Sequence, residues 1–112
     1  MHSFQTVADI RIEPGGADKL DMYVEGLCQN KRIAIITDKG VRGLGLMDAG
    51  VAALKSAGYD VFIFDKVVPD PPEAIVLKGA TAVRKFNAGL IIGFGGGSPM
   101  DTAKVIAHLA GS

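Results

Sequence analysis

GLIIGFGGGSPMDTAK, at residues 89–104, is the stretch that decides the fold. Its first five residues form a short apolar run, which predicts a buried strand over 89–93. A glycine-rich turn follows, and a helix is predicted from Pro99 to about Leu109. A strand that passes through glycines directly into a helix is typical of an α/β protein.

The turn within this stretch suits an anionic ligand. Gly95, Gly96 and Gly97 allow the backbone to turn sharply and to approach a ligand without Cβ clashes. The helix N-terminus behind them offers unpaired N–H groups and the positive end of a dipole, a combination that suits a pyrophosphate. The spacing is neither GxGxxG nor the Walker pattern GxxxxGK[ST].

A structural explanation covers the same residues. Ser98 at the N-cap, Pro99 at N1 and Asp101 at N3 would form a capping-box-like start of the helix. Capping and phosphate binding are compatible, so both interpretations stay open at this point.

The rest of the chain repeats the strand-and-helix rhythm. A break at residues 14–16 and a proline-rich loop at 67–72 separate some of the elements. Strands are predicted at 6–12, 32–37 and 60–66, and helices at 17–28, 46–57 and 73–86.

One helical segment separates each of the later strands from the next, as a parallel crossover requires. We therefore predict an α/β, Rossmann-like, doubly wound parallel sheet. Ligands of such sheets bind beyond the carboxyl ends of the strands. The loops at 37–40, 68–71 and 95–98 should converge at that edge.

Length and composition limit the alternatives. The 112 residues suit one domain, and 48% hydrophobic residues are enough to form a core. Twelve Lys and Arg balance twelve Asp and Glu, which argues against a nucleic-acid-binding protein. We expect no membrane span and no secretory signal. A single Cys28 cannot form an internal disulfide, and we predict a cytoplasmic protein.

Asp38 is the second candidate binding residue. An acidic residue after a parallel strand can accept hydrogen bonds from an adenosine ribose and would repel a 2′-phosphate. The alternative is a solvated turn residue ahead of Gly40. His108 and Cys28 are interpreted as structural, and no metal-ligand cluster or catalytic triad stands out.

Three segments, in register, resemble the iron-containing (group III) alcohol dehydrogenases. They are GGGSPMDTAK at 95–104, IITDKG at 35–40 and VVPDPP at 67–72. The last is similar to a V-x-P-N-P-T loop of that family, with Asp70 in place of the Asn. The continuation Ser-Pro-x-Asp-Thr is also similar to that of the lactaldehyde reductase (propanediol oxidoreductase) branch.

The resemblance implies an NAD-dependent interconversion of alcohol and aldehyde or ketone. It implies that Gly95, Gly96, Gly97 and Ser98 hold the pyrophosphate, that Asp38 contacts the ribose and favours NAD over NADP, and that Asp70 lies beside the adenosine. Asp101, in the first turn of the last helix, completes the candidate cofactor-binding set. A homo-oligomer is also implied.

Members of this family are several times longer than this chain. Their Fe²⁺ or Zn²⁺ is held by one Asp and three His in later segments, mainly in a helical domain. We therefore expect residues 1–112 to be the N-terminal part of a dinucleotide-binding domain, an incomplete domain without metal ligands, without catalytic residues and inactive alone.

A different class of function remains open. A stand-alone α/β nucleotide-binding module or a receiver-like regulatory module would also suit the length. Asp38 and Asp65 at two strand ends offer part of the acidic cluster that such a module needs.

Overall fold

Four parallel strands form one sheet in a computed structural model of the chain. The structure describes residues 6–10, 24, 26, 28, 30–43, 45, 47–95 and 97–110, with the backbone alone at 6–10 and 97–100. The sheet order is β1-β4-β2-β3. The strands are β1 (Thr6–Ile10), β2 (Arg32–Ile36), β3 (Asp60–Phe64) and β4 (Leu90–Phe94).

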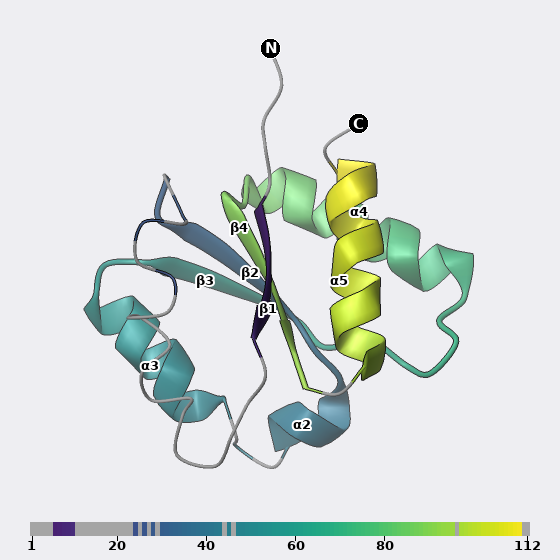
Figure 1. Cartoon of the computed structure of the whole chain (residues 1–112), viewed down its shortest axis with the longest axis horizontal. Coiled ribbons are helices and arrows are strands. Elements are labelled where there is room, and N and C mark those ends of the chain that lie inside the picture. The colour runs from purple at the N-terminus through teal and green to yellow at the C-terminus, as the bar shows by residue number, and fades with distance from the viewer. Residues whose placement is uncertain are drawn as a thin grey trace.

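Alternate residues of the central strands face opposite sides of the sheet. Ile33 and Ile35 of β2 pack in one core cluster, and Ala34 and Ile36 pack in another. Helices cover both faces because both faces are apolar. Figure 1 shows α3 (Asp48–Ser56) on one side and α4 (Glu73–Phe86) with α5 (Gly97–Ala110) on the other. The predicted doubly wound α/β architecture is confirmed for these elements.

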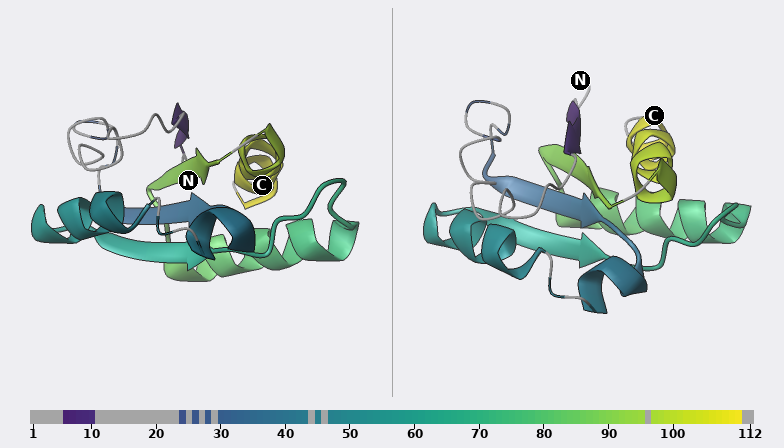
Figure 2. Two further views of the ribbon diagram at one scale, coloured as in Figure 1. Left: turned by 90° about the horizontal axis from the view of Figure 1, so that it is seen from below. Right: turned by 60° about the horizontal axis from the view of Figure 1, so that its bottom comes forward.

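The carboxyl ends of all four strands point to one edge of the sheet. The short helix α2 (Lys39–Gly43) follows β2 there, and α5 begins there after β4 (Figures 1 and 2). A site built at this edge can therefore draw on segments that lie far apart in the sequence.

Side chains at the opposite, amino edge of the sheet bind the carbonyl ends of two helices. Arg32 Nε donates to the Phe86 carbonyl at 2.6 Å, and Asn30 Nδ2 donates to the Asn87 carbonyl at 2.8 Å. Arg84 of α4 donates to the carbonyls of Leu109, at 2.8 Å, and Ala110, at 3.4 Å, at the end of α5. Cationic donors are favourable at helix C-termini, where backbone carbonyls lack intrahelical partners.

Helix and strand predictions agree with the structure within three residues at most boundaries. The helix predicted at 73–86 is α4 itself. Gly58 follows the end of α3 with φ +93°. The residues at 11–23, including the predicted break, lie outside the described residues. The predicted strand at 60–66 ends at Phe64 in the structure.

Two local predictions need correction. The helix predicted over 17–28 does not include Val24 and Gly26, which lie in a turn, because Gly26 adopts φ +81° and that conformation does not continue a helix. The turn predicted after β2 is instead the start of helix α2.

Helices α4 and α5 touch at Gly79. A Cβ atom there would lie 2.5 Å from Ile106 Cδ1 and 3.2 Å from Phe64 Cε2. A side chain at this buried position would therefore have to displace the end of the Ile106 side chain and would crowd the Phe64 ring.

We predict that Gly79→Ala destabilises the protein by about 1 kcal/mol, because overpacking outweighs the gain in helix propensity. Ile106→Val removes the clashing methyl group. The double variant should lose about 1 kcal/mol less free energy of unfolding than the sum of the two single losses. Urea unfolding of all three variants measures this coupling. Thr81→Ala, at an exposed position of α4, is the control. Its effect on the free energy of unfolding should add to that of Ile106→Val, with no coupling between them.

Candidate functional site

Thr37 joins the ends of three strands at the carboxyl edge. Its fully buried side chain donates from Oγ1 to the Phe94 carbonyl at 2.8 Å. Its N–H donates to the Phe64 carbonyl at 2.9 Å, and its own carbonyl accepts from Val67 N–H at 3.3 Å. These bonds hold the beginnings of the three predicted loops side by side. The residues that directly precede two of the predicted loops, Val67 and Phe94, thus lie beside Thr37, the first residue of the third.

Asp38 lies at this edge and caps α2. Its Oδ1 accepts from Val41 N–H at 2.7 Å, and its carbonyl accepts from Arg42 N–H at 3.1 Å. The residue is half-buried. One carboxylate oxygen therefore has a structural role in the turn, and the group keeps the acceptor capacity that a ribose hydroxyl requires.

Gly95 begins the predicted phosphate-binding turn with φ +126°, a conformation that favours glycine. Gly96 lies outside the described residues. Gly97 is the first residue of α5, so Ser98 lies within the helix and not at its N-cap as the capping interpretation predicted. The backbone N–H groups of the first turn of a helix have no intrahelical partners and can bind an anion.

Asp70 and Asp101 are both exposed, and neither carboxylate makes a hydrogen bond or ion pair in the described part of the chain. Asp70 adopts φ +47°. Asp and Asn tolerate this left-handed conformation better than most side chains. The turn itself therefore explains a residue of this type at position 70, independently of any contact with a ligand.

Charges gather beside Asp38. Arg42 Nη1 lies 2.6 Å from Asp65 Oδ2. This hydrogen bond, more than the nearby charges of Lys66 and Lys39, lowers the pKa of the Asp65 carboxyl below its usual value of 3.8. A pocket of about 330 Å³ opens next to this ion pair. Its lining residues are Lys39, Asp65, Lys66, Val67, Val68 and Ile75.

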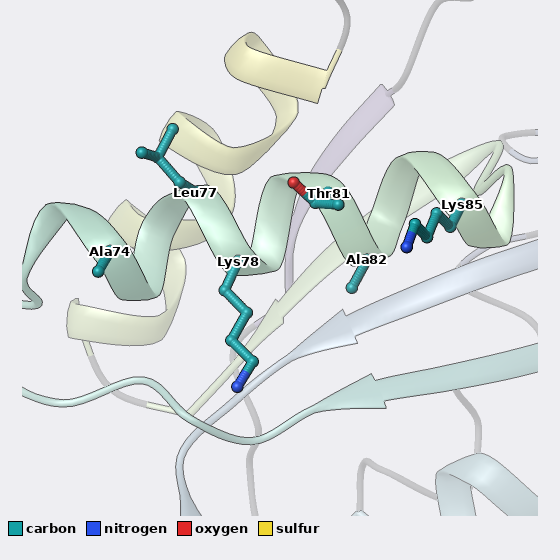
Figure 3. A pocket seen from close by; sticks show the side chains of 6 residues that line it. All are labelled: Ala74, Leu77, Lys78, Thr81, Ala82 and Lys85. Carbon is teal, nitrogen blue, oxygen red and sulfur yellow. The ribbon is translucent and has the colours of Figure 1, made fainter.

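A second hollow lies away from this edge. Figure 3 shows that all its lining side chains come from the outer face of α4. It measures about 450 Å³ and is lined by Ala74, Leu77, Lys78, Thr81, Ala82 and Lys85. No residue of a strand end contributes to it, and we do not assign it to the candidate site.

Cys28 and His108 do not lie at the carboxyl edge. Cys28 is buried, and its Sγ donates to the Arg32 carbonyl at 3.4 Å. His108 is exposed near the end of α5. In the described ranges, no group of three or more His, Cys, Asp or Glu is arranged to hold a metal ion. None of the described helices has the length and apolar character needed to cross a membrane.

The family model for iron-containing alcohol dehydrogenases matches residues 8–112. The chain belongs to the iron-containing alcohol dehydrogenase family. This membership favours a dehydrogenase over the receiver-like hypothesis. Asp65 of that hypothesis is the partner of Arg42 in the structure.

Relatives of known name agree with this family. A choline dehydrogenase from Bacillus subtilis (strain 168) is 35% identical over 105 residues, which are 94% of this chain and 26% of the relative. The 1,3-propanediol dehydrogenase of Citrobacter freundii is 39% identical over 86 residues, 75% of this chain and 22% of the relative. The chain thus spans about a quarter of the length of these relatives.

A solved structure shares the fold. It is the alcohol dehydrogenase ADH/D1 of a halo-thermophilic archaeon from a Red Sea brine pool, bound to NZQ. The TM-score is 0.78 at 25% identity, over 98% of this chain and 27% of the other. The family implies an NAD(P) cofactor and a metal. The residues at the carboxyl edge fit the phosphate and ribose parts of such a cofactor, because a glycine turn, a helix N-terminus and a carboxylate occur there together.

Sequence reasoning missed the role of Thr37 and the pocket that contains Lys39 and Lys66. The signal for Thr37 is a hydroxyl residue at the end of an otherwise apolar strand, where a buried donor needs a partner. No sequence signal identifies the pocket, since residues from α2, the 65–72 loop and α4 come together only in the fold.

We predict that Thr37→Val loosens the carboxyl edge because it removes the buried hydrogen bond to Phe94. Amides at the ends of β2 and β4 should exchange with solvent about tenfold faster, the equivalent of one lost hydrogen bond. Hydrogen-exchange mass spectrometry measures this change. Thr37→Ser loses a methyl group but keeps the hydroxyl, and should protect these amides better than the Val variant. Equal protection in the two variants would contradict the role of the hydroxyl.

The Arg42–Asp65 pair makes stability depend on pH. Because the folded-state pKa of Asp65 is lowered, its stabilisation is present above the unfolded value of 3.8 and is lost as the pH falls through the folded value. Arg42→Met should lower the free energy of unfolding at pH 7 by less than about 1 kcal/mol, since Arg42 is half exposed. Urea unfolding should show this deficit shrinking below about pH 4. Lys55→Met, an exposed change on α3, is the control and should show no such pattern.

Proposed function

We propose that the chain is the N-terminal part of the NAD-binding domain of a metal-dependent alcohol dehydrogenase, which interconverts an alcohol with an aldehyde or ketone. The observation that carries the proposal is the carboxyl edge itself. Thr37 and its hydrogen bond to Phe94 bring the Asp38 carboxylate and the turn at Gly95 to the same edge. The ligand-binding edge of a doubly wound sheet is the one where this combination lies.

Each group at the edge has a distinct task in this proposal. The turn at Gly95–Ser98, together with the N-terminus of α5, binds the pyrophosphate through backbone N–H groups. Asp38 accepts from the adenosine ribose and disfavours a 2′-phosphate. Asp70 lies on the adenosine side, and Asp101 extends the first turn of α5. When bound, the nicotinamide ring accepts or donates the hydride.

Catalysis requires groups that these 112 residues do not supply in this proposal. The metal, Fe²⁺ or Zn²⁺, polarises the substrate oxygen in this kind of chemistry. We assign its ligands to a helical domain outside these residues. Alone, the chain would bind part of the cofactor and would not turn over an alcohol. We also propose a homo-oligomer and a cytoplasmic location, the latter because Cys28 is a single, reduced and buried thiol.

Cofactor preference tests the role of Asp38. In the natural protein, Asp38→Gly should raise kcat/KM with NADP relative to NAD by about tenfold, because it removes a like charge near the 2′-phosphate. Asp38→Asn removes the same charge and keeps an oxygen that can cap α2, so it should produce a similar change. Steady-state kinetics with both cofactors measures the ratio.

Comparison of the two variants separates cofactor binding from capping. If only the Gly variant changes the ratio, the effect comes from the turn and α2, and not from the charge. Asp60→Asn is the matched control, since Asp60 is an exposed acid at the amino edge that pairs with Arg32. It should leave the ratio unchanged. An unchanged ratio in both Asp38 variants would remove Asp38 from the proposed ribose site.

A further inference from the structure

Helix α2 makes few apolar contacts with the sheet beside it. It has five residues, and none of its side chains is buried. Val41 is half-buried and packs against the core cluster on the α3 side of the sheet. A helix as short as this is marginal in water unless tertiary contacts stabilise it. Because so little apolar surface is covered, the position of α2 depends on polar contacts.

One ion pair joins the end of α2 to the end of β3. Arg42 Nη1 lies 2.6 Å from Asp65 Oδ2, and Asp65 directly follows the last residue of β3. The Asp65 side chain is 21% exposed, so water shields the pair only in part. Apart from the cap that Asp38 provides, no other side-chain hydrogen bond or ion pair in the described part of the chain involves α2. This pair is therefore the polar link that ties α2 to the sheet.

Asp38 and Arg42 belong to the same turn of backbone. The Asp38 carbonyl accepts from Arg42 N–H at 3.1 Å, and the Asp38 carboxylate accepts from Val41 N–H at 2.7 Å. A shift of α2 would therefore move the carboxylate with it. Thr37 holds the backbone that enters this turn, through its hydrogen bonds to the ends of the neighbouring strands. Arg42 holds the helix that leaves it, so the carboxylate is fixed from both sides.

We propose that Arg42 and Asp65 are positioning residues for the cofactor: their ion pair holds α2, and with it the Asp38 carboxylate, where that carboxylate accepts from the adenosine ribose. The inference rests on the proposed function, because it takes the ribose contact of Asp38 as given. Neither residue of the pair needs to touch the cofactor. The pair keeps the binding-competent position of the turn populated, and the apparent affinity falls with the fraction of molecules that leave this position.

Steady-state kinetics of the natural protein tests this role by separating KM from kcat. Arg42→Met should raise KM for NAD about threefold to fivefold, because the free energy of a partly exposed ion pair limits the shift in population. Saturating NAD restores the competent position, so kcat should not change. Arg42→Lys keeps the positive charge and should retain most of the affinity for NAD. A general loss of stability would instead lower the melting temperature and the kcat of both variants.

Two double-mutant cycles show whether the pair acts as a unit and whether it acts through Asp38. Asp65→Asn should raise KM for NAD as much as Arg42→Met does, and both changes together no more than either alone, because each breaks the pair. In an Asp38→Gly background, which has no carboxylate to position, Arg42→Met should leave KM unchanged. Asp60→Asn is the matched control. It breaks the exposed pair with Arg32 at the other end of β3 and should leave KM unchanged.

The outcomes separate this inference from the proposed function. If Arg42→Met leaves KM for NAD unchanged, the pair has no positioning role, and the proposed function stands. If Arg42→Met raises KM equally with and without the Asp38 carboxylate, Arg42 acts on another part of the site, and the inference is likewise overturned. Isothermal titration calorimetry with NAD is the remaining check. If the natural protein does not bind NAD, the proposed function fails and the inference fails with it.

Discussion

The buried hydroxyl of Thr37 is the constraint on which the candidate site depends. Thr37 directly follows the last residue of β2, and its hydroxyl donates a hydrogen bond to the carbonyl of Phe94, the last residue of β4. A buried donor at this position must find a partner, and the partner available is the last carbonyl of the neighbouring strand. The residues that follow in each segment therefore start from fixed, adjacent positions. This hydrogen bond alone brings three residues to one edge, without any direct contact among them across the two segments: Asp38, Lys39 and Gly95.

The helix ends at the two edges of the sheet differ in whether their backbone groups have hydrogen-bond partners within the protein. At the amino edge, Arg32 and Arg84 bind the terminal carbonyls of α4 and α5, so those groups are satisfied within the protein. At the carboxyl edge, α5 begins directly after a glycine turn. Its first N–H groups have no partner within the helix. One edge thus stabilises the fold, and the other has donors to offer to a ligand.

Much of this architecture follows from the sequence because its elements are strongly patterned. α4 is bounded by Pro72 and by Asn87 in the left-handed conformation, and both residue types mark helix ends locally. β2 and β4 are short β-branched or apolar runs whose burial on both faces identifies parallel strands. The family resemblance likewise rests on local motifs, which lie at or just after the ends of β2, β3 and β4 in the sequence.

The rest of the site depends on interactions that no local pattern encodes. Helix α2 has five residues and no buried side chain, so no apolar periodicity in the sequence predicts it. Its start depends on Asp38, whose carboxylate is needed for a turn as well as for the proposed ligand. The stretch at 17–28 has helical spacing of apolar residues, but Val24 and Gly26 lie in a turn, and Gly26 adopts φ +81°. The pocket lined by Lys39 and Lys66 forms only in the folded chain, where Ile75 of α4 lies beside the segment after β3.

The contact at Gly79 also constrains how this chain can evolve. A side chain at position 79 meets Ile106, so the order in which the two sites change matters. A lineage that first shortens residue 106 passes through a small cavity, which a folded protein tolerates. A lineage that first adds a side chain at 79 must shift the side chain of Ile106, which packs in the core beneath α5, and α5 follows the turn at Gly95. Drift at these two positions should therefore be directional, with the smaller residue at 106 arising before any replacement of the glycine.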